Sequence, residues 1–138
     1  MRLWPMTLTT DDYAKLASLV SSNLASAFTD PELLREMRHE LRRAELVEPA
    51  DLPEDVTAMN SMITIRDVRT QVPETYTLVF PPRADIANRR LSVLSRAGIA
   101  VLGVRVGDDI QWPAAAGARL MRVDKVVHPK PSRHSVTT

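Results

Sequence analysis

The sequence of 138 residues contains no cysteine, only four glycines and few aromatic residues, and each shortage excludes a class of protein. Without cysteine the chain can form neither a disulfide framework nor a cysteine-based zinc site. Four glycines are too few to build a glycine-rich phosphate loop easily. Aromatic residues make up 4% of the chain, whereas a pocket that stacks bases or holds a proline ring usually uses several.

An excess of charge of one sign is also missing, because 18 basic and 17 acidic residues leave a formal net charge of +1. A domain that mainly neutralises phosphates is strongly basic on one face, so we expect no sequence-specific binding of nucleic acid. Contact with other proteins stays open. No apolar run has the length of a signal peptide or a membrane span. We therefore expect a soluble, cytoplasmic protein that does not bind membranes.

Residues 10–47 are predicted to form a short hairpin of two antiparallel helices. Thr9 is the expected N-cap of the first helix, which should end near Phe28. Asp30 then caps the second helix, with Pro31 at its first position. Each arm would be about 25 Å long at roughly 1.5 Å per residue. The apolar face of the first helix comprises Tyr13, Leu16, Val20, Leu24 and Ala27, which recur at three- and four-residue steps.

The second helix has two charged flanks beside its apolar face. Charged flanks of this kind are more often solvated helix surfaces than binding patches. The basic flank could still be a binding patch, and this alternative stays open. The expected buried residues are Leu33, Leu34, Met37, Leu41 and Ala44; the acidic flank is Glu32, Glu36 and Glu40, and the basic flank is Arg35, Arg38 and Arg42.

Beyond a proline-bearing stretch the hydrophobic period changes to two, which indicates strands. Residues 95–103 interrupt the strands as a short buried helix capped by serine. The fold class is therefore α+β. The predicted division is a hairpin at 1–47, a linker at 48–60, a β-rich domain at 61–128 and a flexible tail at 129–138. The strands are expected at 62–66, 75–80, 91–94, 109–112 and 119–123. Pro113 is expected to end the strand at 109–112.

Residues that could carry chemistry are sparse. The three histidines, His39, His128 and His134, have no metal-binding spacing, and we expect them to be solvated. Asp30 and Glu32 at the hairpin tip could share a divalent cation. However, a helix cap and a favourable charge at a helix N-terminus explain both residues fully. We expect no metal, no cofactor and no catalysis by the chain alone.

Several segments resemble one family in the expected order. DVTAMNS at 55–61 resembles the DVVTMNS segment of the Rnk proteins, regulators of nucleoside diphosphate kinase, which belong with the Gre transcription elongation factors. YTLVFP at 76–81 is similar to TLVYP of that family, and ELRRA at 40–44 to ELDRA. LSVL, AVLG and VGDDIQW, at 91–94, 100–103 and 106–112, resemble LSVMAP…ALLGLRVGDSIHW. The resemblance spans about residues 32–127.

This resemblance implies an FKBP-like antiparallel sheet domain with one short helix, preceded by a coiled-coil hairpin. It also implies a monomer that binds the β′ subunit of RNA polymerase at the rim of the secondary channel. The loop that grips the polymerase matches Leu94, Ser95 and Arg96, where an arginine replaces the family's proline. Since short arms should not carry Asp30 and Glu32 to the catalytic centre, we expect competition with Gre factors without transcript cleavage.

Three alternatives remain open at this point. The tip acids Asp30 and Glu32 could make the chain an active cleavage factor. The FKBP-like fold could bring prolyl isomerase activity, for which only Tyr76, Phe80 and Trp112 are available as pocket aromatics. The family label also suggests an action on nucleoside diphosphate kinase itself, although no residue of the chain points to it.

Overall fold

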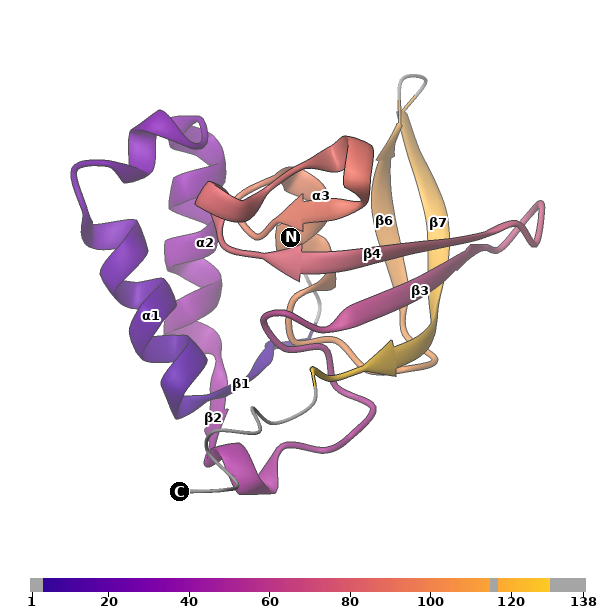
Figure 1. Ribbon diagram of the computed structural model, residues 1–138, viewed down its shortest axis with the longest axis horizontal. Coiled ribbons are helices and arrows are strands. Elements are labelled where there is room, and N and C mark those ends of the chain that lie inside the picture. Colours follow the sequence, from indigo (N-terminus) through magenta and orange to yellow (C-terminus); the bar gives the residue numbers. More distant parts are fainter. Residues whose placement is uncertain (1–3, 115–116, 130–138) are drawn as a thin grey trace.

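The computed structural model describes residues 4–114 and 117–129, so most of the predicted tail at 129–138, including His134, lies outside the described residues. Among the described residues, no helix combines the length and apolarity needed to cross a bilayer. The elements, shown in Figure 1, are β1 (Thr7–Thr9), α1 (Thr10–Ser21), α2 (Pro31–Arg43), β2 (Glu45–Val47), β3 (Met62–Asp67), β4 (Pro73–Val79), β5 (Arg90–Ser92), α3 (Arg96–Val101), β6 (Asp109–Ala114) and β7 (Gly117–Val127).

Five strands form a curled sheet in the order β5-β4-β3-β7-β6, which gives the mixed α+β architecture that was expected. Three of the four pairings are antiparallel. The expectation of a purely antiparallel sheet is wrong for β5, which runs parallel to β4 because two 3-10 turns between them return the chain to its starting side. The strand expected to end before Pro113 continues to Ala114, because β6 is an edge strand and tolerates the missing N–H.

The short helix expected at 95–103 is present as α3 and lies against the sheet. The Ser95 hydroxyl accepts a hydrogen bond from the Gly98 N–H and caps the helix. Gly98 packs so close to β5 that a Cβ atom there would overlap the carbonyl oxygen of Ser92. Gly103, with a φ of 70°, ends the segment in a conformation that favours glycine.

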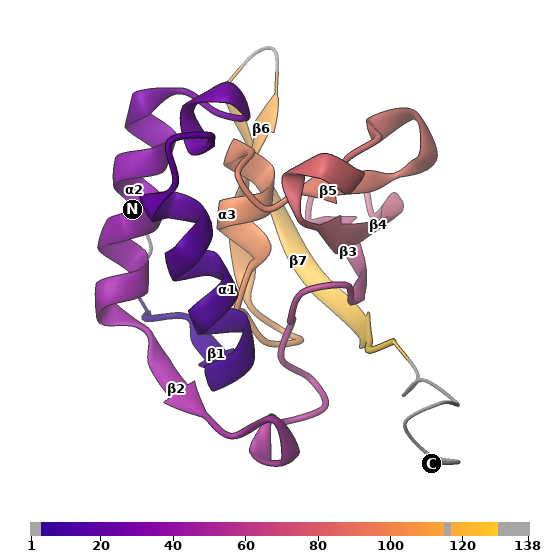
Figure 2. The same cartoon turned by 60° about the vertical axis from the view of Figure 1, so that its left-hand side comes forward.

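The helices α1 and α2 lie side by side and run in opposite directions (Figures 1 and 2). Both expected caps are confirmed: the Thr9 hydroxyl accepts from the Asp12 N–H, and the Asp30 carboxylate accepts from the Leu33 N–H. However, α1 ends at Ser21 and not near Phe28.

Local hydrogen bonds explain the early end of α1. The Ser21 hydroxyl donates to the Ala17 carbonyl, and the Ser22 hydroxyl accepts from the Leu24 N–H, so serine side chains compete with the helical bonds of the backbone. At roughly 1.5 Å per residue, the 12 residues of α1 and the 13 of α2 span about 18 and 20 Å, which is shorter than expected.

The end of the predicted second helix is also different. The helix stops at Arg43, and residues 45–47 form β2, which pairs in parallel with β1. Three-residue strands that pair across about 38 residues of sequence leave almost no periodic signal. The two short strands close the base of the helix pair.

One hydrophobic cluster joins the helices to the sheet. It includes Met6 before β1, Leu16 and Met37 from the helices, and Ile63 and Met121 from the sheet. All five side chains are buried. The helix pair and the sheet therefore share one continuous hydrophobic core.

Glu40 is not on an exposed flank of α2, as the charge pattern suggested, but is fully buried. It follows Leu33 by seven residues and Met37 by three, so the helical period places it in the middle of the apolar face. Its Oε1 atom pairs with the Arg43 guanidinium at 3.0 Å, while its Oε2 atom has no hydrogen-bond partner within the described residues.

We predict that Gly98→Ala lowers the free energy of unfolding by about 2–4 kcal/mol, because the new methyl group must displace α3 from the backbone of β5. Urea denaturation monitored by circular dichroism measures the effect. Ser18→Ala on the exposed side of α1 is the control and should stay within about 0.5 kcal/mol of the wild type. A stability of Gly98→Ala equal to that of the control would contradict the close packing.

Thr57 provides a second test, because its buried side chain joins the segment before β3 to the end of α3. The hydroxyl accepts from the Val104 N–H at 3.1 Å and bonds to the Val101 carbonyl. Thr57→Val leaves these backbone groups unpaired and should cost about 2–3 kcal/mol of unfolding free energy. Thr75→Val, at an exposed position of β4, removes a hydroxyl without burying an unpaired group and should cost less than about 0.5 kcal/mol.

Candidate functional site

The hairpin tip and the loop before α3 are joined directly. The Thr29 hydroxyl donates a 2.7 Å hydrogen bond to the carbonyl oxygen of Leu94, across 65 residues of sequence. The tip therefore rests on the body of the protein and does not project from it. The predicted tip residues and the predicted loop residues belong to one continuous surface.

The three loop residues, Leu94, Ser95 and Arg96, differ in what they expose. Leu94 is buried. The Ser95 hydroxyl is occupied within the loop, where it donates to the Ser92 carbonyl at 2.7 Å and accepts from Gly98. Arg96 is exposed and makes no ion pair within the described part of the chain. Of the three side chains, that of Arg96 is the most exposed.

The tip acids are both exposed, and one of them has a structural task. Asp30 accepts the Leu33 N–H at 2.9 Å as the N-cap of α2, and Glu32 lies in the first turn. Within the described residues, no group of three or more His, Cys, Asp or Glu side chains is placed to hold a metal ion. Asp30 and Glu32 are therefore two exposed carboxylates that belong to no such group among the described residues.

An apolar surface at the tip was not predicted. Leu24 and Phe28 are 69% and 42% exposed, although the first was expected on the buried face of a longer helix. They flank the 3-10 turn Ala25–Ala27, where the chain has already left the path of α1. The run of Ser21, Ser22 and Asn23 was the available signal, because these residues favour helix ends.

The arginine flank of α2 is not simply solvated. The Arg38 guanidinium donates a 2.7 Å hydrogen bond to the Val20 carbonyl in the last turn of α1. A cation is favourable at that end of a helix. The bond holds the second helix to the first just below the tip.

His128, like His39, is half-buried, so the prediction of a solvated side chain is wrong for both described histidines. Its Nδ1 atom lies 3.0 Å from the buried Ser61 hydroxyl, and its Nε2 atom has no hydrogen-bond partner within the described residues. Nearby, Asp12 accepts from the Met59 N–H at 3.1 Å. Burial raises the pKa of Asp12, while the Met59 bond and the neighbouring His128 oppose the shift.

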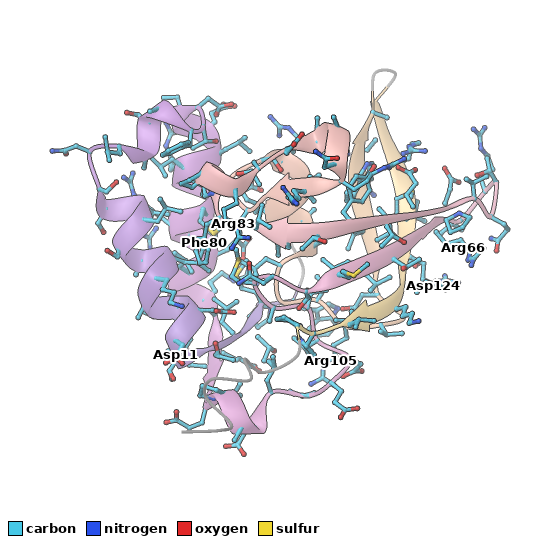
Figure 3. All side chains as sticks on the ribbon, viewed as in Figure 1. Asp11, Arg66, Phe80, Arg83, Arg105 and Asp124 are labelled. Carbon is cyan, nitrogen blue, oxygen red and sulfur yellow. The ribbon has the colours of Figure 1, made fainter. Side chains whose placement is uncertain are left out.

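The aromatic residues expected to line an isomerase pocket do not meet around an open space. Tyr76 and Trp112 are buried and pack against each other with ring centroids 5.3 Å apart. Phe80 lies apart, at the end of β4 that faces α1 (Figure 3), where it borders a separate apolar hollow with Ala14.

The hydroxyl of Tyr76 is also occupied. It donates to Glu74 at 2.6 Å and accepts from Arg89 at 3.0 Å. The hydrogen bond from Tyr76 is the main cause that lowers the pKa of Glu74, and burial raises the pKa of Tyr76. Arg119 completes the network with a 3.0 Å bond to Glu74.

Farther along the sheet, Arg66 and Asp124 form an ion pair at 2.9 Å on the face seen in Figure 3.

Comparison with known proteins gives a consistent picture. The regulator of nucleoside diphosphate kinase of Escherichia coli is 40% identical over 78 residues, which are 56% of this chain and 57% of that protein. The transcription elongation factor GreA of Hyphomonas neptunium is 33% identical over 95 residues, which are 69% of this chain and 60% of that protein. The chain thus spans less than two thirds of these relatives.

A solved structure extends the similarity to most of the chain. The prokaryotic transcription elongation factor GreA/GreB from Nitrosomonas europaea superimposes with a TM-score of 0.76 at 28% identity and covers 89% of this chain and 98% of that one. Residues 52–127, more than half of the chain, match the family described as transcription elongation factor, GreA/GreB, C-term. The resemblance found in the sequence is confirmed, and the chain belongs to the GreA/GreB family.

Proposed function

We propose that the chain is an RNA polymerase-binding regulator that docks on the β′ rim of the secondary channel and competes there with Gre-type factors. Family membership supports the partner. The observation that carries the proposal is the hydrogen bond from Thr29 to Leu94, because it combines the hairpin tip and the loop at 94–96 into one surface. On that surface, Arg96 and the exposed apolar residues Leu24 and Phe28 are available to a partner.

The same geometry supports a regulator that does not stimulate transcript cleavage. The helices span only about 20 Å, and the Thr29 bond keeps Asp30 and Glu32 at the surface of the body. Acids held there cannot extend into a deep channel. In this proposal the helix pair is the short counterpart of a coiled-coil arm, and the division at 1–47, 48–60 and 61–128 marks its functional units.

The proposal also covers the location of the protein, its oligomeric state and the fold type of its sheet. We propose a cytoplasmic monomer with an FKBP-like sheet that has no isomerase activity, because Tyr76 and Trp112 fill the space between them. The Escherichia coli relative is named as a regulator of nucleoside diphosphate kinase. No described side-chain cluster favours that enzyme as a direct partner, so polymerase is the partner we propose.

We predict that Leu24→Ser combined with Phe28→Ser weakens binding to core RNA polymerase by about tenfold or more, since central apolar contacts often carry over 1 kcal/mol each. Biolayer interferometry with immobilised polymerase measures the dissociation constant. The exposure of both side chains should leave the melting temperature nearly unchanged.

The matched control is Val72→Ser, because Val72 is 55% exposed but lies on the turn between β3 and β4, away from the tip. It should bind like the wild type. If the wild type itself does not bind at micromolar concentration, the proposed function is wrong.

We also predict that the wild-type protein, added with magnesium to a backtracked elongation complex, produces no RNA cleavage above the polymerase's own rate. The variant Asp30→Asn tests the alternative, because asparagine keeps the helix cap and removes only the charge. Cleavage by the wild type that disappears in Asp30→Asn would show an active cleavage factor. Denaturing gels of end-labelled transcripts give the readout.

A further inference from the structure

A hollow of about 640 Å³ opens between α2, α3 and β6, next to the loop at 94–96. Ile99 of α3 and Ile110 of β6 contribute to its apolar floor, and Glu36 of α2 lies on one side. Arg96 lines this hollow and begins α3 directly after Leu94 and Ser95, so the hollow continues the surface that we propose for polymerase. A space of this size can receive several side chains of a partner.

Some charged side chains that line the hollow have hydrogen-bond or ion-pair partners, and others have none among the described residues. Asp109 pairs with Arg122 at 2.8 Å, and Asp108 accepts the Arg105 N–H at 3.0 Å. Glu36 and Arg96 have no ion pair or side-chain hydrogen bond within the described residues. The hollow therefore offers one negative and one positive group, on different helices, that a partner can neutralise.

Trp4 adds an anchor at the edge of the same hollow. Its side chain is 76% exposed, whereas Trp112 is 6% exposed. A large aromatic side chain left in water is costly to solvate, and tryptophan is the residue type most enriched among the strongest contacts of protein interfaces. Ile99 and Ile110 are nearly buried, so the exposed indole is the main apolar surface that the hollow offers to a side chain of a bound protein.

We propose that this hollow holds a segment of RNA polymerase that places an apolar side chain against Trp4, a lysine or arginine beside Glu36, and an aspartate or glutamate beside Arg96. The inference rests on the proposed function and adds the chemistry of the partner. Arg96 then acts as a specificity residue at the position where the family pattern has proline. A second copy of this chain and a small molecule are the competing occupants.

The first test reverses the two charges separately. Glu36→Lys and Arg96→Glu should each weaken the binding of core RNA polymerase by about tenfold or more, because each places like charges together in a desolvated contact. Glu54→Lys and Arg69→Glu make the same charge changes at exposed positions outside the hollow, the second on the turn between β3 and β4, and should alter affinity less than about twofold. Circular dichroism melting verifies that all four variants fold.

The second test follows Trp4 directly. Hydroxyl-radical footprinting read by mass spectrometry should show strong oxidation of Trp4 in the protein alone and several-fold protection when core polymerase is added. Trp4→Ala should weaken binding by a factor similar to that of the charge reversals. Trp112 serves as the internal reference, because it is buried in both states.

The outcomes separate this inference from the proposed function. If Glu36→Lys, Arg96→Glu and Trp4→Ala all bind polymerase as the wild type does, and polymerase does not protect Trp4, the inference is wrong. The proposed function then still stands. Protection of Trp4 that rises with protein concentration in the absence of polymerase assigns the hollow to self-association and also overturns it. Absence of binding by the wild type removes both.

Discussion

The contact between α3 and β5 determines how the rest of this molecule is arranged. At Gly98 the helix approaches the backbone of Ser92 without any side chain between them. Ser95 caps the helix at one end, and at the other end the Thr57 hydroxyl donates to the Val101 carbonyl and accepts from the Val104 N–H. These contacts hold both ends of α3 and its side facing β5, so they also position the residues 94–96 on which the tip contact and the neighbouring hollow depend.

Local signals predicted those parts of the fold whose stability is local. The caps at Thr9, Asp30 and Ser95 follow from side chains that satisfy nearby N–H groups, and the structure has all three. The strands of the main sheet follow from alternation of buried and exposed residues, which a half-buried strand requires. Only the parallel pairing of β5 needed knowledge of the path of the chain after β4.

The features that could not be predicted depend on contacts between distant residues or on two competing local preferences. Serine side chains ended α1 early, although the apolar period continued to Leu24. Glu40 was assigned by its charge to an exposed flank, although its helical position lies among Leu33 and Met37. For the candidate site, the loop and the tip were found separately. Their union through Thr29 and Leu94 joins residues 65 positions apart, and no local pattern carries that information.

The tip contact also sets a limit on how this arm can change. One additional turn in each helix would raise the tip by about 5.4 Å, whereas the Thr29 hydroxyl is 2.7 Å from its acceptor and would lose it completely. A longer arm and a docked tip therefore exclude each other.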